Sequence, residues 1–228
     1  MADTNEIKLT INGKDLTARP GQTILEVARD KGIDIPTLCY LEGLLLLGAC
    51  RICVVEVEGS RTLVGSCYTP VTPGMVVQTH SPKVLQARKV LMELLLASHC
   101  GSCYMCQKAN ICEFRKMAAE MELGLPRFTP RKRYYPIEEF SPNLAFDRTK
   151  CILCRRCVRA CRDKAGKSRL GVAYRGFDTK IIYGADQPID AGVCQDCDAC
   201  VAVCPTGSLY RPYAVGQKKE GEPMVIRG

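Results

Sequence analysis

The sequence predicts a protein of the α+β class, and three observations lead to this prediction. Strand patterns separated by short turns fill the first 80 residues, a helical pattern follows, and two cysteine-rich runs separated by further strand patterns come last. Hydrophobic residues make up 46% of the chain and charged residues 25%, which is typical of a globular protein and excludes disordered and fibrous classes. The 228 residues suffice for one large domain or for two to three small ones.

The N-terminal residues alternate polar and apolar side chains, which predicts a β-hairpin. Residues 6–12 form its first strand, Asn12-Gly13 is a two-residue turn of type I′, and residues 15–19 form the returning strand. Thr23 and Glu26 then form a capping box, which predicts the start of a helix. Three more short strands are expected, over residues 54–57, 61–66 and 75–79. A mixed sheet that grips one helix in this way is the β-grasp arrangement.

A longer helix is predicted after the sheet. Ser81 is its N-cap and Pro82 its first residue, and the helix runs to His99. Its apolar face is expected to hold Val84, Leu85, Ala87, Val90, Leu91, Leu94 and Leu95. Arg88 and Glu93 are expected on the opposite, polar face. A second helix is predicted over residues 107–123, and the prolines between residues 126 and 142 indicate an extended linker.

Two cysteine runs near the C-terminus share the spacing C-x2-C-x2-C-x3-C, and the second ends in Cys-Pro. This is the pattern with which a bacterial-type ferredoxin binds two [4Fe-4S] clusters, where the fourth Cys of each run ligates the other cluster. Structural zinc sites also use C-x2-C pairs, but zinc takes four ligands as two pairs, so the third and fourth Cys of each run favour iron–sulfur clusters. We therefore assign one cube to Cys151, Cys154, Cys157 and Cys204, and the other to Cys194, Cys197, Cys200 and Cys161.

Four more cysteines lie in the predicted β-grasp region, with the spacing C-x10-C-x2-C-x13-C. A [2Fe-2S] cluster needs four thiolates, and plant-type ferredoxins place three of them in one loop and the fourth on a later strand. The topology agrees, although the first gap in those ferredoxins is x4, and Gly48 and Gly65 are expected to let the backbone approach the sulfur atoms. We favour a [2Fe-2S] cluster over zinc or buried structural cysteines, with ligands Cys39, Cys50, Cys53 and Cys67.

A fourth site is predicted at the end of the long helix. Cys103, Cys106 and Cys112 are preceded by two competing ligands, His99 and Cys100. With His99 the set reads H-x3-C-x2-C-x5-C and forms a [4Fe-4S] cube with one imidazole ligand. With Cys100 the ligation is all-cysteine. On ligand chemistry alone both assignments stay open, because thiolate is the commoner ligand of a cube.

These motifs together resemble a known family. The order is Ile35-Pro-Thr-Leu-Cys39-Tyr40, Cys50-Arg-Ile-Cys53, the His99 to Cys112 set and the doubled ferredoxin motif. It is similar to the N-terminal iron–sulfur region of the large iron–sulfur subunit of respiratory complex I. The same order occurs in [FeFe] hydrogenases, in NAD-linked formate dehydrogenases and in the small diaphorase subunit of bidirectional NAD-linked hydrogenases. The resemblance implies one [2Fe-2S] cluster, three [4Fe-4S] clusters and His99 as the unusual ligand, with Cys100 left over.

The sequence predicts five segments. They are a β-grasp [2Fe-2S] domain over residues 1–80, a helical [4Fe-4S] domain with one His and three Cys ligands over 81–124, a basic Pro-rich linker over 125–146, a 2[4Fe-4S] ferredoxin domain over 147–210 and a tail over 211–228. No Cys follows Cys204 and no G-x-G-x-x-G motif opens a dinucleotide fold, so we expect no substrate site in this sequence.

The predicted function is that of an electron-relay subunit in a multi-subunit oxidoreductase. Its expected partners are a flavin- and NAD(P)-binding subunit and a second catalytic redox subunit, such as a hydrogenase, a formate dehydrogenase or a similar reductase. Two alternatives are a free-standing polyferredoxin that carries electrons by diffusion, and a catalytic subunit in its own right. Co-purification distinguishes the first alternative from the relay subunit, and a dye-reduction assay of the isolated chain tests the second.

Composition also bounds the location and the kind of partner. Sixteen cysteines at metal-ligand spacings indicate a reducing compartment, and with no leader-like N-terminus or long apolar run we expect a cytoplasmic protein without direct membrane insertion. The net charge is +8, and between Arg127 and Lys180 fifteen Lys or Arg stand against five Asp or Glu. Because few aromatic residues accompany these charges, we expect them to balance the clusters or face an acidic partner, with no nucleic acid bound.

Overall fold

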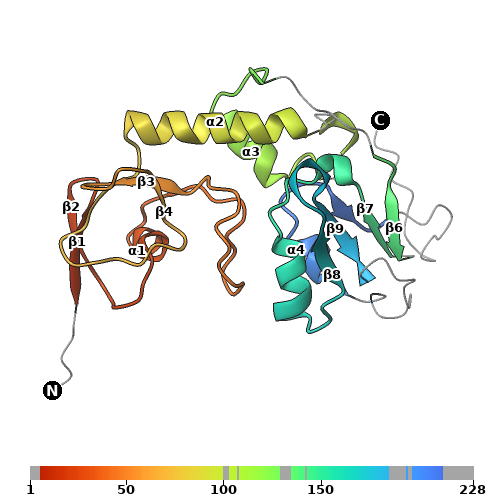
Figure 1. Ribbon diagram of the computed structural model, residues 1–228, viewed down its shortest axis with the longest axis horizontal. Helices are drawn as coiled ribbons and strands as arrows, with labels where there is room; N and C mark the ends of the chain where they lie inside the picture. Colours follow the sequence, from red (N-terminus) through yellow and green to blue (C-terminus); the bar gives the residue numbers. More distant parts are fainter. Residues whose placement is uncertain are drawn as a thin grey trace, which may run out of the picture.

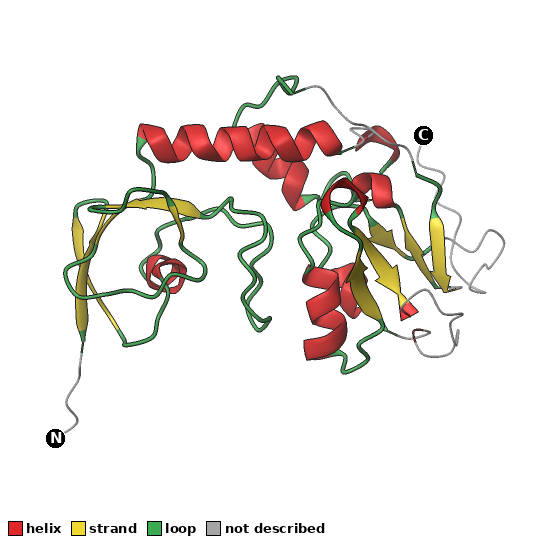
Figure 2. Cartoon of the chain, viewed as in Figure 1, coloured by secondary structure: helices red, strands yellow, loops and turns green. Residues whose placement is uncertain are grey.

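The chain folds into two lobes joined by one long helix. The computed structural model describes residues 6–99, 103–106, 108–128, 135–141, 143–184, 194 and 197–212. We call residues 6–80 the N-terminal lobe and residues 135–212 the C-terminal lobe. Figure 1 shows the helix α2 (Pro82–Ser98) running from above the first lobe toward the second, with α3 (Glu113–Glu120) beneath it. Much of the chain between these elements is loop (Figure 2).

The N-terminal lobe contains a five-stranded mixed sheet in the order β2-β1-β5-β3-β4. The strands are β1 (Ile7–Ile11), β2 (Lys14–Ala18), β3 (Val54–Val57), β4 (Val64–Gly65) and β5 (Val76–Gln78). The first two form the predicted hairpin, with Ile11 opposite Lys14. Asn12 and Gly13 have φ angles of 51° and 76°, which a type I′ turn requires. Strand β1 also pairs in parallel with β5, which joins the hairpin to the rest of the sheet.

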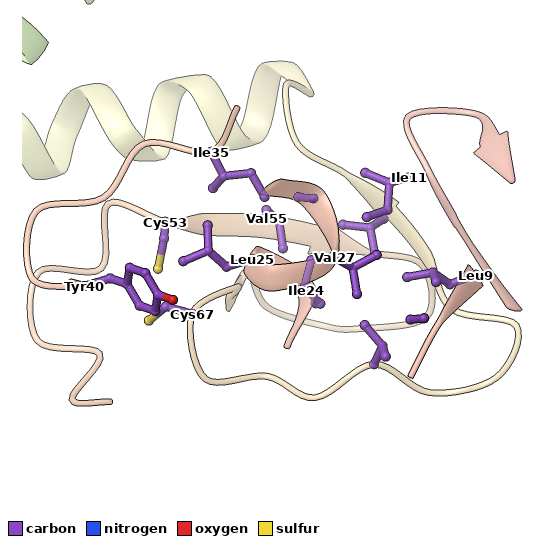
Figure 3. Close-up of a cluster of buried hydrophobic side chains, with 14 residues drawn as sticks. Leu9, Ile11, Ile24, Leu25, Val27, Ile35, Tyr40, Cys53, Val55 and Cys67 are labelled. Atoms are coloured by element: carbon purple, nitrogen blue, oxygen red, sulfur yellow. The ribbon is translucent and has the colours of Figure 1, made fainter. Parts of the chain in front are cut away.

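Helix α1 (Ile24–Asp30) begins at the predicted capping box and packs on the sheet. The Thr23 backbone N–H donates to the Glu26 carboxylate at 2.7 Å, and the Glu26 N–H donates to Thr23 Oγ1 at 3.3 Å. Figure 3 shows Ile24, Leu25 and Val27 pointing into the core, where the sheet closes on them from β1 and β3. Each such buried aliphatic side chain contributes roughly 1.5–3 kcal/mol relative to exposure, so this core fixes the position of the loops around it.

Helix α2 begins at Ser81 as predicted, but the face that it buries differs from the predicted apolar stripe. Its buried residues are Val84, Arg88, Met92, Glu93 and Ala97. Leu85 and Leu94 are instead exposed, at 49% and 47% of their surface. The reason is that both buried charges have partners: Arg88 donates to the Val54 carbonyl at 2.8 Å, and Glu93 pairs with Arg127 at 2.7 Å.

A second core unites the lobes beneath α2. Its buried members are Leu38, Ile52, Met92, Cys112, Phe114 and Met117, which come from the N-terminal lobe, from α2 and from α3. Ile152, from the first ferredoxin run, packs against the same cluster. Because segments that lie far apart in the sequence share this core, the loops that carry their cysteines are held next to one another.

The C-terminal lobe contains two small sheets and short helices. Strands β6 (Glu138–Ser141), β7 (Leu144–Phe146) and β10 (Leu209–Tyr210) form one sheet, and β8 (Leu170–Ala173) and β9 (Lys180–Tyr183) form a hairpin. The helices are α4 (Arg156–Arg159), which continues as the π-helix η3 (Ala160–Lys164), and α5 (Ala199–Ala202).

Strands β6 and β7 lie within residues 125–146, which the sequence assigns to a linker. Phe140 and Phe146 are buried and stacked at 5.2 Å, and their burial draws this segment into the C-terminal lobe. The second predicted helix is also shorter than expected, because α3 begins only after Cys112. Within the described residues, no helix has the length and apolar character needed to cross a membrane.

The capping box at α1 generates a stability prediction. Thr23→Ala removes the acceptor for the Glu26 N–H, so the helix should lose about 1 kcal/mol of stability. Hydrogen exchange of the α1 amide groups should then accelerate about fivefold. The exposed Thr62 lies outside the helix, and Thr62→Ala should leave the α1 exchange unchanged. Equal exchange rates in the Thr23 variant and the parent protein would contradict the proposed role of the cap.

Candidate iron–sulfur cluster sites

The first candidate site lies where the β3–β4 pair meets the loop after α1. Antiparallel pairing of Val54 with Gly65 places Cys53 next to Cys67, whose sulfur atoms lie near the Tyr40 ring in Figure 3. The Cys39 backbone N–H donates to the sulfur of Cys50 at 3.3 Å. The structure therefore brings Cys39, Cys50, Cys53 and Cys67 together.

The thiols of this site act on one another electrostatically. A hydrogen bond from Cys50 lowers the pKa of Cys39 to about 5, and one from Cys67 lowers the pKa of Cys53 to about 6. The pKa values of Cys50 and Cys67 are raised, first by these same hydrogen bonds and then by burial. The thiols of each pair thus lie within hydrogen-bonding distance of one another. Four neighbouring thiols, two of them with a lowered pKa, are a suitable donor set for a [2Fe-2S] cluster.

Tyr68 covers the loops of this first site. A Cβ at Gly48 or at Gly65 would overlap the Tyr68 ring, so the two glycines make room for this ring. From sequence, the same glycines were expected to let the backbone approach the sulfur atoms. Arg51 donates to the Tyr68 hydroxyl and also lies over its ring, at 5.2 Å from the centroid. The sequence does not predict this position of the Tyr68 ring, because no local pattern links Tyr68 to the two glycines.

The second candidate site lies at the C-terminal end of α2. His99 is the C-cap residue of this helix, and its buried ring makes an edge contact with Phe114 at 5.1 Å between centroids. Cys112 is buried and is the N-cap of α3, where its sulfur accepts from the Arg115 N–H at 3.4 Å. Phe114 follows Cys112 by two residues, so the imidazole lies against the segment that carries this thiol.

The other cysteines of the second site lie nearby. Cys103 and Cys106 are half-buried at the turn η1 (Cys103–Met105). Burial raises the pKa of Cys112, with further contributions from the charges of Cys106 and Cys103, so the three sulfur atoms are neighbours. Cys100, the competing ligand, lies outside the described residues.

In the structure the last cysteine of each ferredoxin run lies near the other run. Burial raises the pKa of Cys151 to about 11 and of Cys154 to about 12, and repulsion from Cys204 contributes to both. The pKa of Cys157 is raised in the same direction by burial and then by Cys154, Cys151 and Cys204. Cys204 of the second run therefore lies with the first run.

The remaining four thiols form the complementary group. Burial raises the pKa of Cys200 to about 12, and the next contributions come from Cys161, Cys194 and Cys197. Cys161 of the first run thus lies with the second run. Buried thiols with such raised pKa values are protonated at neutral pH, so iron must displace their protons when it binds.

Backbone and side-chain donors point at several of these sulfur atoms. Leu153 and Arg155 flank Cys154 with φ angles of 53° and 56°, a left-handed geometry that curls the loop around the site. Cys161 accepts from the Arg169 N–H at 3.2 Å, and Tyr183 Oη lies 3.0 Å from the sulfur of Cys194. Hydrogen bonds to ligand sulfur atoms tune cluster potentials. Tyr183 was missed from sequence because it belongs to the hairpin between the runs.

The second site and the C-terminal end of the second ferredoxin run are adjacent. Lys108 donates to the carbonyls of Val201 and Cys204, at 2.6 and 3.2 Å. A Cβ at Gly207 would overlap the sulfur of Cys106, so this thiol rests directly on the turn after Cys204. The structure thus places the cysteine segment after α2 next to the group formed by Cys151, Cys154, Cys157 and Cys204.

Two arginines of the first run lie where only one of the two expected roles is open to them, which were to balance the clusters or to face an acidic partner. Arg156 and Arg159 are only 2% and 4% exposed, and they donate to groups inside the protein. They are therefore not available to an acidic partner, whereas Arg162 is exposed and pairs with Asp163. The sequence shows positive charge along this segment but not which side of the short helix faces inward.

No group of three or more His, Cys, Asp or Glu side chains, among those that the structure describes, is arranged around a single metal ion. An iron–sulfur cluster spreads its ligands over the corners of a larger body, so its thiols need not converge on one point.

Comparisons with known proteins match three consecutive parts of the chain to family models. Residues 4–82 match a 2Fe-2S iron-sulfur cluster binding domain. Residues 88–127 match the NADH-ubiquinone oxidoreductase-G iron-sulfur binding region, and residues 141–210 match the ferredoxin-like domain of NADH-quinone oxidoreductase subunit 3. The protein is therefore a mixed α/β chain with 2Fe-2S and 4Fe-4S ferredoxin-like domains.

Individual relatives cover nearly the whole chain. It is 34% identical to the gamma subunit of the NAD-reducing hydrogenase HoxS of Cupriavidus necator, over 89% of this chain and 86% of that protein. It is 40% identical to the HndD subunit of the NADP-reducing hydrogenase of Solidesulfovibrio fructosivorans and 38% identical to the G 2 subunit of the NADH-quinone oxidoreductase of Rhizobium meliloti. These alignments include 89% and 91% of this chain, which spans only 36% and 24% of those two proteins.

A solved structure agrees with the sequence comparisons. A crystal structure of NAD+-reducing [NiFe]-hydrogenase in the H2-reduced state contains a chain that is similar to this one, with a TM-score of 0.81 and 30% identity. The match covers 91% of this chain and 88% of the hydrogenase chain.

The contact between Gly207 and Cys106 generates a prediction about iron binding. Gly207→Ala places a methyl group where the Cys106 sulfur lies, so this thiol must move away from the other residues of its site. We expect the reconstituted variant to lose up to about four iron atoms per chain, while the [2Fe-2S] signal in EPR spectra persists. Nothing lies within 4 Å of a Cβ added at Gly124, so Gly124→Ala is the matched control. Full iron content in the Gly207 variant would show that Cys106 is not held as described.

Proposed function

Because the chain belongs to the family of iron–sulfur subunits of NADH-quinone oxidoreductases and NAD-reducing hydrogenases, we propose that it is an electron-relay subunit of a multi-subunit oxidoreductase. The proposal rests mainly on one observation: each of the four groups of candidate ligands lies in contact with the next. The loop of the first site touches the first ferredoxin run, and the turn after Cys204 touches the site after α2. The two ferredoxin groups share one buried core.

The proposed cofactors are one [2Fe-2S] cluster and three [4Fe-4S] clusters, held by fifteen cysteines and His99. The clusters supply one-electron redox chemistry when bound. The chain's own residues bury them, fix their spacing and direct hydrogen-bond donors at their sulfur ligands. No part of this role requires a substrate site within the chain.

The proposed partners are a flavin- and NAD(P)-binding subunit and a second catalytic redox subunit, in a cytoplasmic hetero-oligomer. An exposed apolar loop supports docking near the first site, since Leu45, Leu46 and Leu47 expose 63%, 41% and 41% of their surface. Apolar residues gathered at one surface of a soluble protein are typical of an interaction site. A free-standing polyferredoxin is the alternative function.

Purification of the tagged full chain from its own host, without oxygen, tests this function. We expect about fourteen iron atoms per chain and a co-purifying flavoprotein that oxidises NADH or NADPH. In that complex the nucleotide should reduce the clusters, whereas the isolated chain should stay oxidised. A chain that purifies alone and accepts electrons from several unrelated donors would favour the diffusible carrier. Stoichiometric zinc with little iron would overturn the cofactor assignment.

The ligand choice between His99 and Cys100 gives a separate prediction, in which we propose His99 as the ligand. Imidazole is neutral where thiolate is anionic, so a His-ligated cube carries one less negative charge and has a higher potential. His99→Cys should therefore lower the potential of that cube or destabilise it, as measured by an EPR-monitored redox titration.

Cys100→Ser is the companion variant and should leave the EPR spectrum of the same cube nearly unchanged. The opposite pattern, with the signal lost in Cys100→Ser and retained in His99→Ala, would identify Cys100 as the ligand.

A further inference from the structure

Two buried arginines join the ligand loops of two different candidate clusters. Arg156 and Arg159 belong to α4, immediately around Cys157, and both guanidinium groups are withdrawn from solvent. They reach across to the loop between α1 and β3, which carries Cys39 and extends toward the C-terminal lobe in Figure 2.

Arg159 makes the central contact. Its Nη2 donates to the carbonyl of Cys39 at 2.5 Å and to that of Cys154 at 3.4 Å. One nitrogen atom thus bridges a cysteine of the first site and a cysteine of the first ferredoxin run. The Nη1 atom donates to the Leu45 carbonyl at 2.5 Å, which fastens the far end of the same loop.

Arg156 extends the connection to the segment that carries Cys112, in the second candidate site. Its Nη2 donates to the Tyr40 carbonyl at 2.9 Å, next to Cys39. Its Nη1 contacts both oxygens of the Glu113 carboxylate, at 2.8 and 2.9 Å, next to Cys112. Asp163 completes the arrangement by accepting from the Leu45 N–H at 3.4 Å.

The chemistry of these contacts suits a rigid spacer. A guanidinium keeps its charge at all relevant pH values and presents several N–H donors in a fixed plane, which lysine does not. Burying a guanidinium is unfavourable unless it finds hydrogen-bond acceptors, and the carbonyls of the loop after α1 accept from both arginines. Apolar side chains could fill the same space, but they could not hydrogen-bond to the carbonyls of both segments at once.

We propose that Arg159, supported by Arg156, is a positioning residue for electron transfer between the [2Fe-2S] site and the first ferredoxin cube. This inference rests on the proposed function. In this role Arg159 keeps the distance between the Cys39 and Cys154 segments constant. With both clusters bound, one electron would leave one cluster, which would be oxidised, and enter the other, which would be reduced. No covalent bond changes, and the guanidinium keeps its proton.

The test uses the full chain with reconstituted clusters, reduced by dithionite, so it requires no partner subunit. Arg159→Gln removes the charge and the bridge, and Arg159→Lys keeps the charge but cannot bond both loops. Arg175 is exposed on the hairpin of the same lobe, so Arg175→Gln is the control for loss of charge alone. Two quantities are measured: hydrogen exchange of the amides in residues 39–47, and the magnetic interaction between the two reduced clusters in EPR spectra.

We expect both Arg159 variants to exchange the amides of residues 39–47 about tenfold faster or more, because a hydrogen bond to a charged group is lost from each side of the bridge. The EPR splitting and relaxation enhancement that report the spacing of the two clusters should weaken or broaden. The control variant should match the parent protein in both measurements. The supporting variant, Arg156→Gln, should change the same two quantities in the same direction.

Unchanged exchange and unchanged EPR interaction in Arg159→Gln would overturn the inference, as would full retention of both in Arg159→Lys. An equal change in the Arg175 control would also overturn it, since charge and not contact would then be responsible. If Arg159→Gln does not assemble its clusters, Arg159→Lys and Arg156→Gln decide the outcome. A chain that fails to pass electrons to any partner would refute the proposed function and leave these two readouts intact.

Discussion

Burial of many thiols in a chain with little regular structure is the constraint on which the rest of the fold depends. Burial raises the pKa values of Cys151, Cys154 and Cys200 to about 11, 12 and 12, because a thiolate is costly in a poorly solvated site. The surrounding helices are short, and α4 and α5 span only four residues each. Binding of iron at such sites contributes directly to the stability of the folded state.

Part of the positive charge lies inside the protein. Arg88, Arg156 and Arg159 are buried, and Lys108 reaches across to a neighbouring segment; all four donate to backbone carbonyls of other parts of the chain. Loops without strand or helix partners leave carbonyl groups that need donors, and a long cationic side chain supplies several at once. These four cationic side chains therefore join segments that lie far apart in the sequence.

The local elements were predictable because their signals lie within a few residues of one another. The hairpin at Asn12-Gly13, the capping box at Thr23 and the N-cap at Ser81 all form as the sequence indicates. The face of α2 was not predictable in this way. Its periodicity favours the leucine stripe, but the carbonyl of Val54 and the side chain of Arg127 stabilise the burial of Arg88 and Glu93 instead.

The sequence by itself determined the kind of chemistry, since cysteine spacing is a local property and the doubled C-x2-C-x2-C-x3-C run matches a known mode of cluster ligation. Only the tertiary structure decided what lies between the ligand sets. The Tyr68 ring over Gly48, the Cys106 sulfur against Gly207 and the Arg159 bridge from Cys39 to Cys154 all join segments that are separated in the chain. Such contacts depend on how separate loops pack around a shared core, and no short pattern in the sequence encodes that packing.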